Sequence, residues 1–159
     1  MFISCNEPAR DHDATSSDIA RNTISNNIQL EVRNLDVSRA VLVNEQGNPV
    51  SSNNTTDVNK PLKLRVFINN GWVARKGKVA LGAYQKIETF QKQVVLEEKD
   101  LFEEIGPISS EEAKIITISA NIKKIYRKKD SFHVSFRIWD KNGTGNIEGS
   151  YKLIVNSPQ

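Results

Sequence analysis

Residues 132–155 hold two alternating stretches on either side of a short polar connection, and they constrain the fold more than any other part of the sequence. Alternation with a period of two is typical of a β-strand that buries one face. The connection contains Asn142-Gly143, a pair that favours a two-residue type I′ turn. The segment therefore predicts an antiparallel hairpin.

A turn centred on Asn142-Gly143 also predicts which residues of the two strands face each other. Apolar residues meet on one face and polar residues on the other, and a slip of one residue would move every side chain to the wrong face. The predicted pairs are Phe132 with Leu153, Val134 with Tyr151, Ser135 with Ser150, Phe136 with Gly149, Arg137 with Glu148, Ile138 with Ile147 and Trp139 with Asn146.

Shorter stretches with strand character recur through the rest of the chain, separated by turn-forming residues. They lie at 28–33, 41–43, 61–68, 79–84, 93–97 and 114–125, with brief helical turns at 100–105 and 108–112. About eight short strands with almost no helix predict an all-β, antiparallel β-sandwich of immunoglobulin-like or transthyretin-like plan. Its expected core includes Leu64, Val66, Ile118, Phe136, Ile138 and Tyr151.

The first 27 residues differ in composition from the remainder. They contain few apolar residues and many Asn, Ser, Asp and Thr, so they cannot bury enough surface to offset their chain entropy. We therefore expect a signal remnant and flexible tether at 1–27 and a β-sandwich domain at 28–159. The net charge of +3 is too small to indicate nucleic acid as a partner.

The lone cysteine has an informative setting. Phe2-Ile3-Ser4-Cys5 resembles the end of a bacterial lipoprotein signal, although the basic start and most of the apolar region of such a signal are missing. The resemblance implies a lipid on Cys5 and a membrane-anchored protein of the cell envelope, facing the periplasm or the surface. If Met1 is the true start, the alternative is a cytoplasmic protein.

Catalytic residue types are scarce in this sequence. His12 lies in the expected tether and His133 on the expected outer face of a strand. The sequence has no glycine-rich phosphate loop, no His and Cys spacing of a metal site and no nucleophile elbow. We expect a protein without enzymatic activity and without a cofactor.

The connection of the hairpin resembles part of a calcium-binding loop. Asp140, Asn142 and Thr144 match the first three ligand positions of the EF-hand pattern, and Gly145 matches its glycine. Tyr151 stands where that pattern needs a bidentate glutamate, and the flanks alternate as strands do. The sequence favours a plain turn, with a metal site as the alternative.

Two groups of residues are candidates for interaction. The densest basic cluster consists of Lys123, Lys124, Arg127, Lys128 and Lys129. It could contact phosphate, in lipid headgroups or nucleic acid, but the favoured interpretation is a charged hairpin end that prevents edge pairing. Trp139, beside Arg137, is either an exposed binding aromatic or a residue covered by a loop.

Two function classes remain open. The first is a non-enzymatic, lipid-anchored interaction module with a protein partner in the cell envelope, an accessory to an envelope or secretion assembly by analogy of plan alone. The second is a calcium- or carbohydrate-binding sandwich that uses residues 140–145 or exposed aromatic side chains. No nucleic-acid partner is expected, and the sequence does not define a small molecule.

Overall fold

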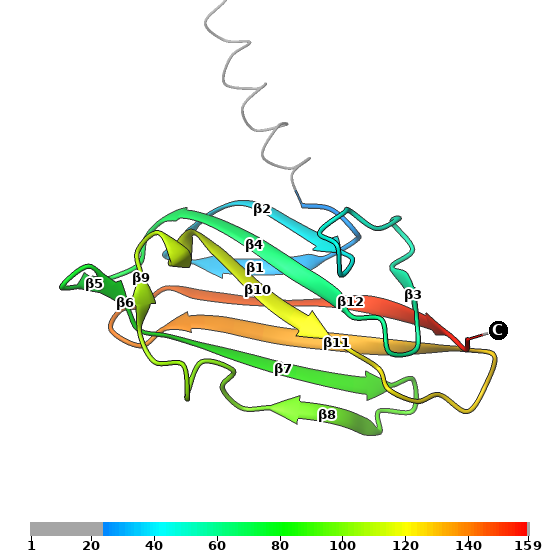
Figure 1. Cartoon of the computed structure of the whole chain (residues 1–159). Coiled ribbons are helices and arrows are strands. Elements are labelled where there is room, and N and C mark those ends of the chain that lie inside the picture. Colours follow the sequence, from blue (N-terminus) through cyan, green and yellow to red (C-terminus); the bar gives the residue numbers. More distant parts are fainter. Residues whose placement is uncertain (1–23, 159) are drawn as a thin grey trace, which may run out of the picture.

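The structure, a computed structural model, describes residues 24–158, and its regular secondary structure is almost entirely β-strand (Figure 1). No helix in this range has the length and apolar character needed to cross a bilayer. The strands are β1 (Gln29–Arg33), β2 (Asp36–Val43), β3 (Thr55–Asp57), β4 (Leu62–Asn70), β5 (Ala74–Arg75), β6 (Lys78–Val79), β7 (Leu81–Thr89), β8 (Val94–Glu98), β9 (Ile108–Ser109), β10 (Ile115–Ala120), β11 (Lys129–Asp140) and β12 (Asn146–Asn156).

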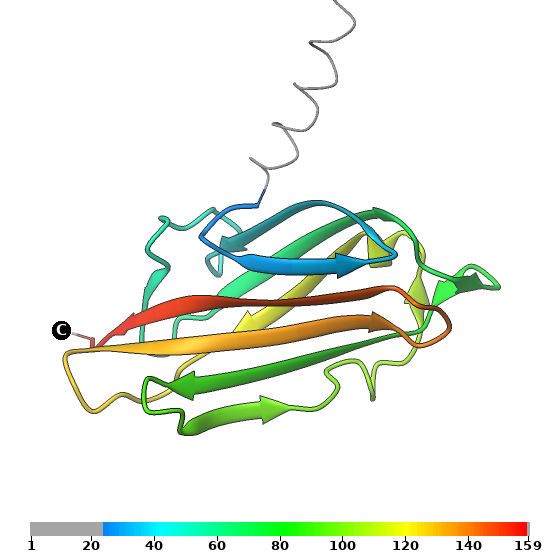
Figure 2. The same cartoon turned by 180° about the vertical axis from the view of Figure 1, so that it is seen from behind.

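Two antiparallel sheets pack face to face, which confirms the predicted all-β sandwich. The larger sheet has the order β1-β12-β11-β7-β8, with β3 joined in parallel to β12. The smaller sheet has the order β10-β4-β2, and a third small sheet, β5-β6-β9, extends from one end (Figures 1 and 2). β11 and β12 lie at the centre of the larger sheet.

The register of β11 against β12 agrees with the sequence prediction at all seven predicted pairs. The turn type was wrong, because neither Asn142 nor Gly143 has the positive φ that a type I′ turn requires. The strands instead end at Asp140 and Asn146, and the N–H of Asp140 donates to the carbonyl of Gly145 across a wider loop (2.9 Å). Register therefore depends on the alternating strands more than on the turn.

The core fills the space between the two sheets. All six core residues expected from the sequence are buried. Phe136 lies over Gly149 on the neighbouring strand, where a Cβ atom would collide with its ring. Phe136 also approaches Tyr151, with ring centroids 6.4 Å apart. The hairpin thus supplies much of the aromatic part of the core.

Some predicted elements differ from those observed. β3 falls inside a segment that the sequence predicts as a loop, and the strand expected at 114–125 ends at Ala120. Residues 101–105 form turns that stop at Gly106, whose φ is +76°, and a single 3₁₀ turn spans Glu112–Lys114. Ser109 Oγ accepts the N–H of Glu112 (3.1 Å) at the start of this turn.

Residues 24–27, which precede the predicted boundary at residue 28, also contact the sandwich. Ile24 forms a parallel bridge with Ala40, and Asn26 is buried. The side-chain amide of Asn26 donates to Asn54 Oδ1 (3.1 Å) and its oxygen accepts the N–H of Leu42 (2.9 Å). Residues 24–27 therefore belong to the sandwich, and Cys5 and His12 lie outside the described residues.

Replacing Phe136 with alanine should lower the free energy of unfolding by about 3–5 kcal/mol, because a buried ring is lost over Gly149. Chemical denaturation measures this change. Ser135→Ala, one residue along on the outer face, is the matched control and should change stability by less than about 0.5 kcal/mol. Equal effects of the two variants would contradict the assignment of the strand faces.

Candidate functional site

The outer face of the larger sheet carries a tryptophan held in a fixed position. Trp139 on β11 lies against Gly82 of β7, where any Cβ atom would overlap the indole ring. The guanidinium carbon of Arg137 lies 5.0 Å from the centroid of that ring. Trp139 is half-buried against β7, so the predicted outward orientation is confirmed, and the ring is supported by a strand and not by a loop.

Arg137 is exposed but has two polar contacts besides the indole ring. Its Nε donates to Oδ1 of Asn146 (2.6 Å), and it lies 3.9 Å from a carboxylate oxygen of Glu148. We call Trp139, Arg137, Asn146 and Glu148 the tryptophan face. A groove of about 430 Å³ lies beside it, bounded on its far side by Arg33 of β1 and by residues 143–145. The arrangement is an anchored aromatic and a cation next to a polar concavity.

Paired charges continue across the outer face towards β8. Tyr84 Oη donates to Glu97 (2.6 Å), and this hydrogen bond raises the pKa of Tyr84 and lowers the pKa of Glu97. Lys86 pairs with Glu88 (3.0 Å), and Glu88 faces the exposed His133 in the ladder. Exposed pairs of this kind add little to stability. They do give the face a defined pattern of donors and acceptors.

Asp140, the last residue of β11, is the only carboxylate among the proposed calcium ligands, and it accepts hydrogen bonds from the backbone. Asp140 is 4% exposed, and its two oxygens accept the N–H groups of Val73 (2.7 Å) and Asn142 (2.9 Å). Thr144 Oγ1 accepts a hydrogen bond from the side-chain amide of Asn34 (3.1 Å). Residues 24–158 hold no group of three or more His, Cys, Asp or Glu side chains placed to bind a metal. Two of the three side chains proposed as calcium ligands, Asp140 and Thr144, therefore already have hydrogen-bond partners.

A cation also lies next to this loop. Lys141 Nζ lies 2.6 Å from Asp100, a largely buried carboxylate. Burial alone would raise the pKa of Asp100, but hydrogen bonds from Lys141 and from the N–H groups of Phe102 and Ala83 together lower it. The ion pair joins the loop to the segment that follows β8. The positive charge of Lys141 so close to the loop further disfavours a bound cation.

The basic cluster lies in the connection that carries the chain from the smaller sheet to β11, and all five of its basic residues are exposed. In the structure these five residues line two separate hollows. Lys123, Lys124 and Arg127 line a groove of about 650 Å³ beside β8. Lys128 and Lys129 line a second hollow, of about 500 Å³, together with Asp57 and the C-terminal residues 156–158.

The larger groove combines basic and apolar side chains. Its opposite wall is formed by Val94, Val95 and Leu96 of β8 and by the turn that precedes them. Tyr126 beside it is 86% exposed, and Phe90 in the neighbouring turn is 71% exposed. The sequence shows these apolar residues but not their exposure, because that depends on how β8 folds back onto β7.

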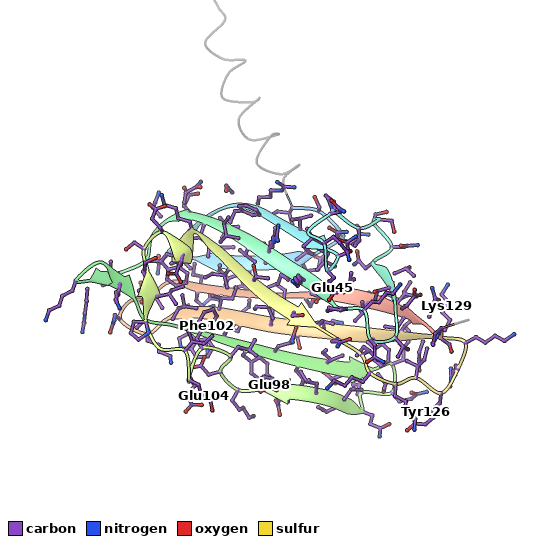
Figure 3. All side chains as sticks on the ribbon, viewed as in Figure 1. Glu45, Glu98, Phe102, Glu104, Tyr126 and Lys129 are labelled. Carbon is purple, nitrogen blue, oxygen red and sulfur yellow. The ribbon has the colours of Figure 1, made fainter. Side chains whose placement is uncertain are left out.

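We call residues 89–95 and 121–130 together the basic end. Figure 3 shows Tyr126 and Lys129 at this end of the sandwich. The predicted role of the cluster, a charged end that prevents edge pairing, stays a prediction, and the edge strand near the cluster is β8. β8 carries its own protection in Glu97, Glu98 and a bulge that sets Val94 and Val95 opposite Glu88 alone.

Comparisons with known proteins add only a likeness of fold. No protein-family model matches the sequence, and no curated protein matches it. The crystal structure of the C-terminal domain of wzt is similar with a TM-score of 0.46 and 9% identity, over 84% of this chain and 79% of that one. The X-ray structure of a structural-genomics target, SoR45, gives a TM-score of 0.36 and 11% identity, over 84% and 89%. These values carry no argument about activity.

Asp140→Ala should lower the free energy of unfolding by about 1–3 kcal/mol, because two backbone N–H groups lose their acceptor. Calcium titration of the unaltered protein by calorimetry should show no binding tighter than about 1 mM. A micromolar calcium site that Asp140→Ala abolishes would contradict this assignment.

Proposed function

We propose that this chain is a non-enzymatic interaction module and that its tryptophan face binds a protein partner. The observation that carries the proposal is the support of Trp139 by Gly82 and Arg137. Tryptophan and arginine dominate binding energy at protein interfaces, most of all when they are held in place before binding. Both side chains have defined contacts within this chain, Trp139 with Gly82 and Arg137 with the indole ring and Asn146.

The outer face of the larger sheet also has the breadth that a protein partner needs. Figure 2 shows β1, β12, β11, β7 and β8 side by side, with no other element of the described chain lying over them. The tryptophan face lies towards the end of this surface where β11 meets β12. A partner could therefore contact several strands around it.

A carbohydrate ligand is less well supported at the same place. Sugar rings bind by stacking on an open aromatic face, and Arg137 lies over one face of the Trp139 ring. Gly82 lies against the six-membered part of the indole. Little of the ring is therefore left for stacking, whereas an edge contact with a protein side chain remains open.

We also propose that the module is a lipoprotein of the cell envelope, anchored through Cys5. The support is the sequence alone, namely the three residues before this lone cysteine and the polar segment after it. Two acyl chains would bury enough methylene groups for firm attachment. In this proposal the sandwich is an accessory part of an envelope or secretion assembly.

The tryptophan face can be tested by a photo-crosslinking amino acid placed at Ser135, beside Arg137 on the outer face of β11, in the native cells. We expect one discrete protein adduct, and we expect Trp139→Ala to reduce its yield about tenfold or more because the anchor is lost. The matched control places the crosslinker at Thr117, an exposed residue on the smaller sheet. No adduct from Ser135, or an equal adduct from Thr117, would contradict the proposed surface.

The anchor can be tested by expressing the gene with its upstream region and labelling with palmitate. We expect label in the membrane fraction, and a soluble, unlabelled protein after Cys5→Ala. Unlabelled protein with a start confirmed at Met1 would rule out the anchor and leave the tryptophan face untouched as a proposal.

A further inference from the structure

The positive charge of the protein is concentrated at the basic end. Its two segments carry Lys92, Lys123, Lys124, Arg127, Lys128 and Lys129 against one acidic residue, Asp130, a net charge of +5. The whole chain has a net charge of +3, and residues 1–23 carry −2, so the other residues that the structure describes have no net charge. The two segments lie against each other along the larger groove. This end therefore presents a positive field on a described domain that is otherwise neutral overall.

The same end holds the two most exposed aromatic side chains of the described residues. Lys124 Nζ lies 5.0 Å from the centroid of the Tyr126 ring, and Lys152 Nζ lies 5.4 Å from that of Phe90. Val94 and Val95, at the wall of the groove, are about half exposed. Each ring is thus paired with a cation, and aliphatic surface lies between the pairs.

We propose that the basic end docks on the surface of an anionic lipid bilayer. Lysine and arginine side chains next to such a surface are attracted by its headgroups, and aromatic rings prefer the level of the headgroups. Where a lysine lies beside an exposed ring, the ring can sit at the level of the headgroups while the lysine lies next to their negative charge. The half-exposed valines add apolar surface that only a lipid or an apolar partner would cover.

Two other anionic partners fit this surface less well. Single-stranded nucleic acid binds by stacking bases on open aromatic faces, and here a lysine lies over one face of each ring and leaves only the other for a base. An acidic peptide could add as a strand to β8, but the bulge at Val94 and Val95 and the carboxylates of Glu97 and Glu98 oppose this. A bilayer needs neither base stacking nor a regular strand edge.

Docking at this end leaves the tryptophan face free. β11 begins at Lys129 in the basic end and reaches Trp139 ten residues later, a span of about 33 Å at 3.3 Å per residue. The lipid surface and a protein partner would therefore contact opposite ends of one strand. The inference goes beyond the proposed protein interaction and does not depend on it.

The test is flotation of the purified protein with vesicles of two compositions. One is phosphatidylcholine alone, and the other contains about one part phosphatidylserine to two parts phosphatidylcholine. We expect binding to the anionic vesicles that weakens as salt rises, and little binding to the neutral ones. Equal binding to both, or none to either, would overturn the inference.

A charge reversal locates the docking surface. Lys123→Glu with Lys124→Glu and Arg127→Glu should reduce partition to anionic vesicles about 100-fold or more, since each basic residue near such a surface contributes about fivefold. The matched control is Arg75→Glu with Lys76→Glu and Lys78→Glu, in the β5–β6 hairpin at the opposite end (Figures 1 and 3). The control makes the same change in net charge and should reduce partition by less than about threefold.

A second variant separates a bilayer from other anions. Phe90→Ser with Tyr126→Ser leaves the charge unchanged and should reduce vesicle binding about tenfold, because the inserted rings are lost. Binding to free polyglutamate should not change. Unchanged binding of this variant to vesicles would overturn the lipid assignment. Tighter binding of the native protein to polyglutamate or to oligodeoxythymidine than to vesicles would overturn it too. Near-ultraviolet circular dichroism of each variant confirms the fold.

Discussion

The pairing of β11 with β12 is the constraint on which the rest of the structure depends. The two strands face each other over eleven residue pairs, from Lys129 with Asn156 to Trp139 with Asn146. β7 pairs with the free side of β11, and β1 and β3 pair with β12. Any slip in this hairpin would turn Phe136 and Ile138 out of the core and disrupt the contacts of both neighbouring strands.

The hairpin register could be predicted from the sequence because it depends on nearby residues of alternating character. Phe136 opposite Gly149 is an example, since a large ring and a bare backbone complement each other locally. The turn could not be predicted, because the buried carboxylate of Asp140 accepts the N–H of Val73, which is distant in sequence. The amide contacts between Asn26 and Asn54 were missed for the same reason.

For the candidate surfaces too, the sequence predicted features that depend on nearby residues and missed those that depend on distant ones. The sequence identified Trp139, Arg137 and the basic cluster as residues, and the alternation placed Trp139 on the outer face. It could not show that Gly82 supports the indole ring, because β7 lies far away in the chain. Nor could it show that β8 brings Phe90 and two valines beside Lys123 and Lys124. The chemistry of a single residue can be read from the sequence, whereas the set of residues that forms one surface depends on the order of the strands in the sheet.

The two surfaces occupy opposite ends of β11, so a rigid strand would fix their separation. The β11–β12 hairpin should accordingly be the most stable part of the sandwich. Hydrogen exchange of the native protein tests it most directly, because the last amides to exchange open only by global unfolding. We predict that the middle of β11 and β12 exchanges most slowly, and that residues 121–128 exchange early. Slower exchange in β4 and β10 than in β11 and β12 would contradict the account.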